Sequence, residues 1–378
     1  MATLASNLQT SANYVCYHGR EYANGTTHGS ILDNVVIAAP SSWSATNEDR
    51  WTEGSWSGGG ANPNGNGVSV IFGKPSTSGS VWLDASTSVG AMAFYSNVNT
   101  TISSTNGSVL TLDNQAAAGD GGAGPAGITV LGGAHAINPD ITLSSSAVVT
   151  VLDGSSQMIL GGNISGAGKK LTKGGAGTLV LSGTNNTYSG GTTVSLGVLQ
   201  AGAVNTLPVS GAVILFDAAG VVLNLNGNSQ TIGSLAGGGA IGGNVDLGGG
   251  QLTVGDSTST TYAGVISGTG HGSRLTKIGA GSLTLSGTNT YSGATIVKEG
   301  GLSISQPYLS DTADVSIGGA ATLTLTFTGE DKIGRLFCDG VQQKRGVYGP
   351  GDLGGRLAGS GFLRVMGDPA DGACLIVR

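Results

Sequence analysis

One internal repeat constrains the fold of this chain more than any other feature. Leu171–Gln200 and Leu275–Ser303 have nearly the same sequence, and Lys173 of the first copy corresponds to Lys277 of the second, an offset of 277 − 173 = 104 residues. Repeated units that are too small to bury an apolar face alone gain a core by stacking on their neighbours. The repeat therefore predicts an architecture of stacked units.

Each copy of the repeat combines short apolar strands with dense turn signals. Thr178–Leu181 and Ser282–Leu285 are four-residue apolar or alternating runs, which predict short strands. Ser182–Asn186 consists of turn-forming residues, and further strands are predicted from Thr192 and from Gly197. Strands this short cannot bury their own apolar faces, so the pattern is typical of a β-solenoid.

The repeated residues also resemble a known family. The pattern L-T-K-x-G-A-G-[TS]-L-x-L-S-G-T-N-x-Y-S-G-x-T-x-V is similar to the autotransporter-associated β-strand repeat, also called the passenger-associated transport repeat. The resemblance implies a right-handed parallel β-helix in a secreted or surface-displayed bacterial protein, and it implies no enzymatic activity. The segment after residue 330, with the words L-x-x-D-G-V-Q-Q, G-x-Y and G-S-G-x-L-x-V, resembles the closing segment of the large surface-protein class that carries these repeats.

Composition agrees with an all-β solenoid and excludes several classes of protein. Hydrophobic residues make up 39% of the 378 residues, charged residues 10%, and 70 residues are glycine, which suits tight corners. A net charge of −6 argues against nucleic acid as a partner. No apolar run is long enough for a transmembrane helix. The first residues show no signal peptide, so we expect an export signal to have been removed.

We predict an all-β fold with a single elongated right-handed parallel β-helix and a cap at each end. The expected domains are an N-terminal cap or subunit-contact segment over 1–67, a solenoid over 68–330 with repeats at 164–200 and 266–303, and a C-terminal capping unit over 331–378. Residues 1–40 either cover the first coil or extend to a neighbouring subunit by strand addition. Strands are expected at Val68–Phe72, Ala91–Phe94, Ile141–Leu143, Val148–Leu152 and Gln251–Val254, among others.

Three tryptophans near the N-terminus are the candidate contact residues. Trp43, Trp51 and Trp56 lie within fourteen residues of each other. They could fill the end of the solenoid as a small core, which we favour because buried indoles are common. The alternative is an aromatic platform for a glycan or for another subunit.

The search for chemistry gives no catalytic, cofactor-binding or metal-ligating residue. Cys16, His18 and His28 fit no common zinc spacing. The scattered acidic residues are interpreted as turn formers; they are Asp113, Asp153, Asp217 and Asp246. Lys173 and Lys277 are interpreted as solvated lysines before a glycine turn.

The three cysteines leave two alternatives open. Cys338 and Cys374 could form a disulfide in an oxidising compartment, which would leave Cys16 unpaired. Three buried free thiols are the other alternative.

The predicted function is structural and non-enzymatic. We expect a rod, stalk or self-assembling fibre subunit in the extracellular space or on the bacterial surface, with end-to-end self-association or contact with other surface proteins. An adhesin or glycan-binding module is the alternative, and a β-helix polysaccharide lyase or hydrolase is a weaker one. No cofactor and no nucleic-acid partner are expected.

Overall fold

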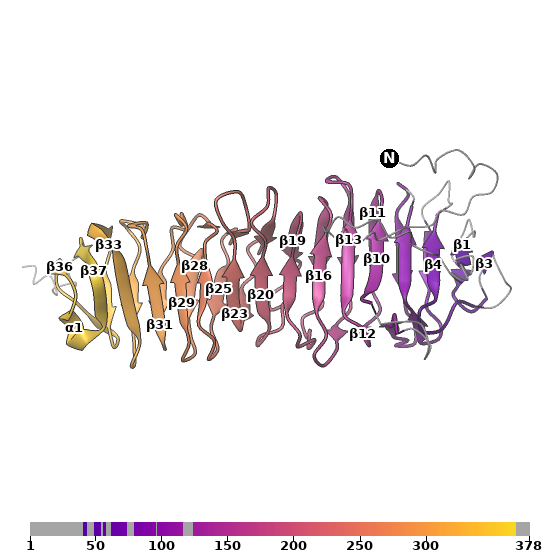
Figure 1. Ribbon diagram of the computed structural model, residues 1–378, viewed down its shortest axis with the longest axis horizontal. Helices are drawn as coiled ribbons and strands as arrows, with labels where there is room; N and C mark the ends of the chain where they lie inside the picture. The colour runs from indigo at the N-terminus through magenta and orange to yellow at the C-terminus, as the bar shows by residue number, and fades with distance from the viewer. Residues whose placement is uncertain are drawn as a thin grey trace, which may run out of the picture.

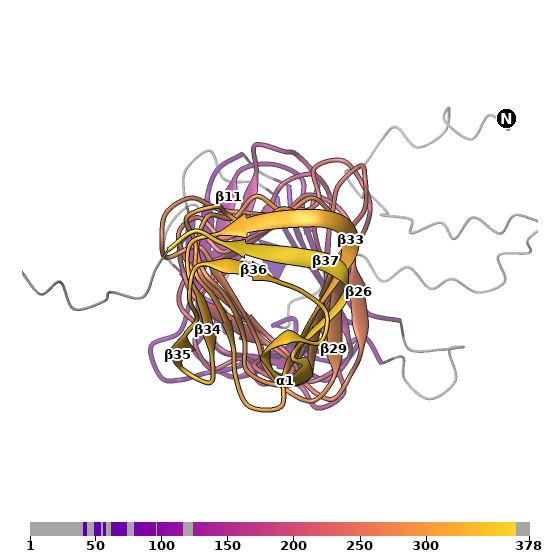
Figure 2. The same ribbon diagram turned by 90° about the vertical axis from the view of Figure 1, so that its left-hand side faces the viewer.

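The protein is an elongated parallel β-solenoid (Figure 1). The computed structural model describes residues 41–43, 49–53, 56–57, 62–73, 79–95, 97–115 and 124–367. Seen along its axis, successive coils superpose around a common centre (Figure 2). The predictions for residues 1–40, including strand addition, lie outside the described residues.

Sheet A forms one face along the whole rod and has sixteen strands. In spatial order they are β3 (Trp56–Ser57), β1 (Ser41–Trp43), β4 (Ser69–Phe72), β7 (Ala91–Phe94), β10 (Ala126–Val130), β13 (Ala147–Val151), β16 (Leu171–Gly174), β18 (Thr192–Val194), β20 (Ala212–Leu215), β23 (Ser234–Gly237), β26 (Thr260–Tyr262), β29 (Ser282–Leu285), β31 (Gly301–Ile304), β33 (Thr322–Ile333), β37 (Leu357–Val365) and β36 (Gly346–Tyr348).

The other faces are shared by three shorter sheets. Sheet B has β2 (Asp49–Arg50), β5 (Gly79–Trp82), β8 (Thr100–Ser103), β11 (Ala134–Ile137), β14 (Gln157–Leu160), β17 (Thr178–Leu181), β19 (Val198–Ala201), β21 (Val222–Asn224), β24 (Asn244–Asp246) and β27 (Ile266–Ser267). Sheet C has β6 (Thr87–Val89), β9 (Leu110–Leu112), β12 (Ile141–Leu143) and β15 (Ile164–Ser165). Sheet D has β22 (Gln230–Ile232), β25 (Gln251–Val254), β28 (Arg274–Lys277), β30 (Thr295–Val297), β32 (Val315–Ile317), β34 (Leu336–Cys338) and β35 (Val341–Gln342).

Neighbouring strands come from successive coils and pair in parallel, so like positions stack. In β10 and β13, for example, Ile128 pairs with Val149 and Val130 with Val151, and all four side chains are buried. Strand residues alternate between inside and outside, and the inward ones form one continuous core from Trp51 to Val365. Burying each such Val, Leu or Ile side chain contributes roughly 1.5–3 kcal/mol before entropy is counted. The predicted solenoid, with its apolar ladders, is confirmed.

The two copies of the repeat occupy different faces of the solenoid. The first copy contributes β16 and β18 to sheet A and β17 and β19 to sheet B. The corresponding strands of the second copy are β28 and β30 in sheet D and β29 and β31 in sheet A. The offset of 104 residues is therefore not a whole number of coils. The same sequence fits either position because the faces of the solenoid are nearly equivalent.

The parallel ladders continue past residue 330, where we expected the capping unit to begin. β34 pairs in parallel with β32, and β37 pairs in parallel with β33. Only the short strands β35 and β36 pair antiparallel at this end. The helix α1 (Asp352–Gly355) has four residues and is the one helix in the part of the chain that the structure describes. Tyr348 packs against the core, whereas Phe362 is 39% exposed.

Candidate functional site

Two buried lysines hold the corners of the repeat, and this overturns our interpretation of them as solvated. Lys173 is 0% exposed, and its Nζ donates to the carbonyl oxygens of Gly174 (2.8 Å), Gly175 (2.7 Å) and Leu196 (3.0 Å). Its three N–H groups match three carbonyls that the sharp corner turns away from the strand ladder.

Lys277 repeats this arrangement at the corner between sheets D and A. Its Nζ donates to the carbonyl oxygens of Ile278 (2.5 Å), Gly279 (2.8 Å) and Glu299 (3.4 Å), and the residue is 1% exposed. Burial lowers the pKa of Lys277, and the nearby carboxylates of Asp256 and Glu299 act in the opposite direction.

Burial also lowers the pKa of Lys173, to about 8. A pKa at that level leaves the ammonium charged at neutral pH, so all three N–H groups remain donors. Both lysines therefore join one coil to the next through hydrogen bonds at a corner of the solenoid. Neither side chain faces solvent as a reactive amine.

A buried asparagine replaces a missing strand in each copy of the repeat. The segment around Asn186 has no strand, but its Oδ1 accepts from the amide N of Ile164 in the preceding coil at 2.5 Å. Its Nδ2 donates to the carbonyl of Thr206 in the following coil at 2.6 Å. Asn289 of the second copy accepts from the amide N of Ile266 at 2.7 Å. The side-chain amide therefore takes the place of a ladder rung.

The repeat tyrosines close the same turns from inside. The hydroxyl of Tyr188 lies 2.7 Å from the Oγ1 of Thr192, and Tyr291 is at 2.7 Å from Thr295. Burial raises the pKa of both phenols, so they remain protonated. The N-x-Y-S-G-x-T part of the repeat is thus a packed turn with its polar groups satisfied.

We predict that Asn186→Leu destabilises the protein by about 2 kcal/mol, because it leaves the Ile164 amide and the Thr206 carbonyl without their partner. Hydrogen exchange should show lost protection at the Ile164 amide. Asn185→Leu is the matched control, since Asn185 is exposed and should change stability by less than about 0.5 kcal/mol. Equal effects of the two substitutions would contradict the conclusion that the Asn186 side chain links the preceding and following coils.

Trp51 and Trp56 lie at the N-terminal end of the described core. Trp51 is 0% exposed, and its Nε1 donates to the carbonyl of Pro63 at 3.1 Å. Trp56 is partly buried, its ring centroid is 4.9 Å from that of Trp51, and both rings are near Phe72. This placement supports the core role for Trp51, because a fully covered ring offers no face to a sugar. For Trp43, the structure gives the backbone pairing with Trp56 and Phe72 only.

The disulfide between Cys338 and Cys374 stays a prediction. Cys338 is a partly buried free thiol in β34. Cys374, like Cys16, lies outside the described residues.

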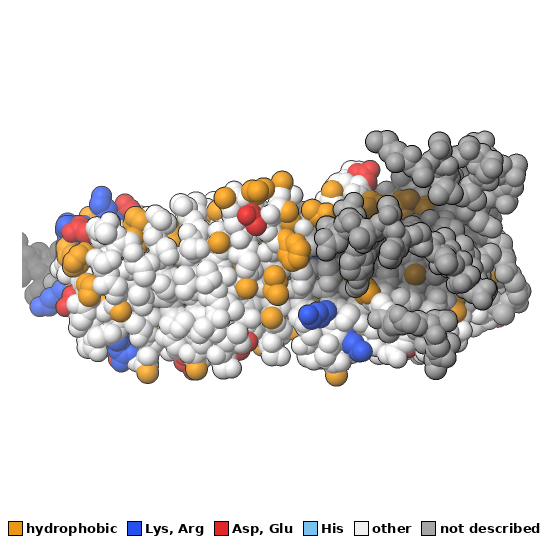
Figure 3. All heavy atoms as spheres, viewed as in Figure 1, with side chains coloured by type: hydrophobic (Ala, Val, Ile, Leu, Met, Phe, Trp, Pro, Cys, Tyr) orange, Lys and Arg blue, Asp and Glu red, His pale blue; other side chains and the backbone are white. Residues whose placement is uncertain are grey.

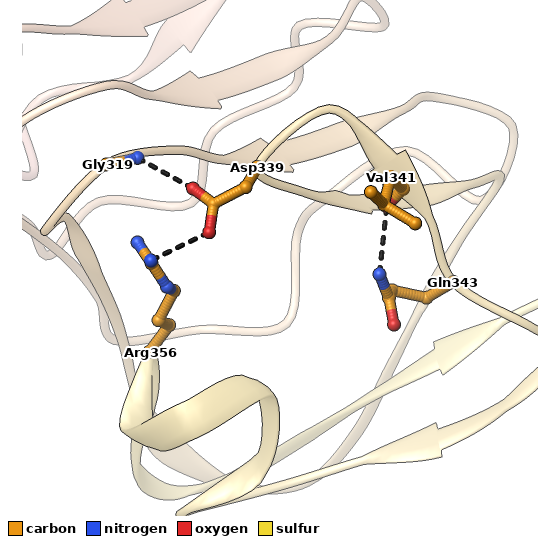
Figure 4. Close-up of polar contacts among 5 residues, drawn as sticks. All are labelled: Gly319, Asp339, Val341, Gln343 and Arg356. Carbon is orange, nitrogen blue, oxygen red and sulfur yellow. Dashed lines mark hydrogen bonds and ion pairs between the residues drawn. The ribbon is translucent and has the colours of Figure 1, made fainter.

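Asp339 ties the closing unit to the coil before it (Figure 4). Asp339 and Gly340 form the two-residue turn between β34 and β35, with φ of 51° and 79°, as Asp-Gly does in tight hairpins. One carboxylate oxygen accepts from the amide of Gly319 at 2.9 Å, and the other pairs with the guanidinium of Arg356 at 2.8 Å. The D-G-V-Q-Q motif is therefore explained by turn geometry and by this link between coils.

Asp339→Ala should destabilise the C-terminal end by about 1 kcal/mol, because the Gly319 amide loses its acceptor and alanine disfavours a positive φ. The ion pair with Arg356 is partly exposed and adds little. Faster hydrogen exchange at Gly319 is the measurement. Asp339→Asn keeps an acceptor and tolerates the turn, so it should retain most of the protection; equal loss in both variants would contradict the assignment.

Three of the four acidic residues are turn formers, as predicted from the sequence. The carboxylates of Asp113, Asp153 and Asp246 each accept from a backbone amide two residues later. Asp217 accepts from the amides of Ile241 and Gly242 in the next coil. No group of His, Cys, Asp and Glu that could hold a metal ion occurs among the described residues.

A shallow groove lies on the outer face of sheet D near the C-terminal end. Its volume is about 570 Å³. Strand register puts Arg274, Ala294, Asp314 and Arg335 in one outward row, and the small Ala294 leaves the hollow. Asp314 and Arg335 pair with each other at 2.6 Å, and the Arg335 guanidinium lies over the ring of Phe337. The groove can offer hydroxyls, the imidazole of His271 and a guanidinium to a polar ligand. The hydroxyl of Ser292, which also lines it, donates to the carbonyl oxygens of Gly268 and Gly270 at 3.5 and 3.3 Å.

Comparison with known proteins agrees with the resemblance of the repeats. The passenger-associated-transport-repeat family matches residues 171–201 and 275–304. The chain carries two copies of this repeat. This repeat protein is 39% identical over 180 residues to the adhesin BmaC autotransporter of Brucella suis biovar 1 (strain 1330). The match covers 47% of the chain and 5% of that relative, so the chain corresponds to a small part of it. No solved structure matches the chain.

Sequence reasoning missed the role of the repeat lysines, although a signal was present. Lys173 stands two residues after the buried Leu171, and Lys277 two residues after Leu275, so strand alternation places each lysine inward. The groove on sheet D carried no such signal, because its residues lie in different coils.

Proposed function

We propose that this chain is a non-enzymatic structural segment of a bacterial surface or extracellular protein, where it acts as a rod that separates other parts of that protein. The observation that carries the proposal is the unbroken core from Trp51 to Val365 along one sixteen-stranded sheet. Stacked coils of this kind couple each unit to its neighbours and give a stiff, extended shape. No helix in the described part of the chain is long and apolar enough to cross a membrane.

Electron microscopy of the purified chain tests the rod. Sixteen strands at about 4.8 Å each predict a particle roughly 7–8 nm long, with isolated rods as the expected result. End-to-end filaments would favour the fibre-subunit version of the proposal. Globular particles would contradict both versions.

An adhesin-like role is the second candidate. Its support is the likeness of nearly half of the chain to part of a protein named as an adhesin. Beads coated with the purified chain should bind host-cell monolayers if the segment itself is adhesive, and should remain at the level of albumin-coated beads if it is a spacer. A glycan-binding version would require Trp43, Trp56 or the sheet D groove, since Trp51 is covered. Arg274→Ala tests the groove in the same assay.

A further inference from the structure

The groove on sheet D lies between two coils that carry arginine, and its floor comes from two coils with shorter side chains. Arg274 begins β28, whereas Ala294, Asp314 and Arg335 directly precede β30, β32 and β34, and strand register places the four in one row. At a coil spacing of about 4.8 Å, the Cα atoms of the two arginines are roughly 14 Å apart. The short side chain of Ala294 leaves a hollow directly beside Arg274.

The two arginines differ in what they contact. Arg335 donates through Nε and a terminal nitrogen to the two carboxylate oxygens of Asp314, at 2.9 and 2.6 Å. This bidentate pairing neutralises both groups, so Asp314 does little to repel an anion. The Arg274 side chain is partly buried, and among the described residues it has no ion pair and no side-chain hydrogen bond. Its planar guanidinium is therefore available for a carboxylate.

The groove gathers positive charge on an acidic chain. With His271 neutral, its two arginines and one aspartate give 2 − 1 = +1, whereas the whole chain carries −6. The groove lies away from the face over sheet A, since β34 and β29 are on different sides of the rod (Figure 2). On the face over sheet A, charged side chains are few and lie mainly at the C-terminal end and toward the long edges (Figure 3). The groove is therefore a local point of attraction for an anion.

The rest of the lining suits a saccharide better than a simple anion. Thr312 and Ser316 bring hydroxyl groups to the groove, and Ala294 and Ile296 give it an apolar floor. A sugar ring has hydroxyl groups at its edge and C–H groups on its faces, so it uses both parts of this lining. The volume of about 570 Å³ is within the range of small-ligand sites.

We propose that the groove binds a short acidic oligosaccharide, whose carboxylate pairs with Arg274 while the sugar ring lies over Ala294 and Ile296. Thr312 and Ser316 then form hydrogen bonds with the ring hydroxyls. An acidic peptide shares the carboxylate but lacks the ring and its hydroxyls, so the floor and the polar lining favour the saccharide. This inference deepens the adhesin-like candidate and rests on it for its biological use.

Saturation-transfer NMR on the full chain tests the site with trigalacturonate as the probe. One uronic acid unit in contact has about 13 non-hydrogen atoms, which at the efficiency of drug-sized ligands corresponds to a Kd on the order of 1 mM. The methyl ester of trigalacturonate is the matched neutral probe, because it keeps the rings and hydroxyls and loses the charge. A tetraglutamate peptide is the matched acidic probe without sugar rings. We expect both to bind at least tenfold more weakly than trigalacturonate.

Two substitutions locate the bound probe. Arg274→Ala removes the guanidinium, and Ala294→Leu fills the hollow without a change of charge, so each should weaken binding at least tenfold. Arg345→Ala and Ala236→Leu are the matched controls. Arg345 is exposed in the closing unit, Ala236 lies on the outer face of sheet A, and neither lines the groove. Both controls should bind the probe as the parent does, and circular dichroism checks that all four variants fold.

The outcomes separate the parts of the proposal. A parent chain without saturation transfer at about 10 mM trigalacturonate overturns it, as does binding that persists in both groove variants. Equal binding of the methyl ester overturns the carboxylate pairing with Arg274, and equal binding of the peptide overturns the assignment to a saccharide. None of these results bears on the rod, which depends on the core. Beads that adhere although the chain does not bind trigalacturonate would place the adhesin-like role elsewhere on the chain.

Discussion

Lys173→Met should lower the free energy of unfolding by about 3–4 kcal/mol, although the substitution keeps the length of the side chain and removes a buried charge. The reason is that three carbonyl oxygens, those of Gly174, Gly175 and Leu196, lose their donor at once. Each unsatisfied buried acceptor costs about 1–3 kcal/mol, and the removal of the charge offsets part of the sum. Thermal unfolding, with hydrogen exchange to locate the effect, is the measurement.

The chain offers controls for this substitution. Lys170→Met changes an exposed lysine only three residues away and should alter stability by less than about 0.5 kcal/mol. Lys277→Met should repeat the effect in the second copy, somewhat more weakly because its third contact is longer, at 3.4 Å. Since units of a solenoid are coupled mainly to their neighbours, the loss of exchange protection should centre on the altered corner. A Lys173→Met protein as stable as Lys170→Met would contradict the conclusion that Lys173 stabilises the corner between two coils.

The strands of the solenoid were predictable because stacking leaves a simple signal. Ala91–Phe94, Ile141–Leu143 and Gln251–Val254 were expected at the bounds that the structure shows. Other strands were missed, and they carry polar or small residues, as Thr100–Ser103 and Ala134–Ile137 do. Inward positions there are filled in part by Thr100 and His135, and the Nδ1 of His135 accepts from the backbone amide of Thr100 at 3.0 Å.

The placement of the repeats could not be read from their sequences. The offset of 104 residues does not show which face of the solenoid the second copy occupies unless the length of every intervening coil is known. In the structure the second copy starts on sheet D, whereas the first starts on sheet A. The groove depends on the same coil lengths, because it is built from single residues of several coils. Local pattern reasoning therefore gives the fold class and the contents of the core, and it leaves the outer surface undetermined.

A buried carboxyl in the last coils makes the stability of the protein depend on pH. Asp331 is 5% exposed, and its Oδ2 accepts from the amide of Leu309 at 2.9 Å. After the first repeat, Gln230 makes the equivalent hydrogen bond, in which its Oε1 accepts from the amide of Leu207 at 3.1 Å. The two leucines follow the repeat tyrosines by similar distances, 309 − 291 = 18 and 207 − 188 = 19 residues. The second copy thus uses an ionisable acid where the first uses a neutral amide.

Burial, with a smaller contribution from Asp311, raises the pKa of Asp331 to about 6, above the ordinary value of 3.8. Between those two values the folded protein binds more protons than the unfolded chain, so the free energy of unfolding falls as pH rises. A difference of about two pKa units corresponds to a loss of about 3 kcal/mol from this group, complete above pH 6 and absent below pH 4. Other carboxylates add their own pH dependence, so the comparison must be made against a variant.

Asp331→Asn should remove this contribution while it keeps an acceptor for the Leu309 amide. We expect the stability of the variant relative to the parent to rise by about 2–3 kcal/mol between pH 4 and pH 6.5. The weaker amide acceptor lowers the stability of the variant equally at every pH, so it does not change this rise. Thermal unfolding of both proteins across that range measures the difference. Asp311→Asn, at an exposed neighbour, should shift the transition slightly to lower pH without abolishing it. A stability difference between parent and Asp331→Asn that is constant with pH would show that Asp331 does not titrate in this range. Contacts other than the amide of Leu309 would then have to offset the effect of burial on the pKa of this carboxyl.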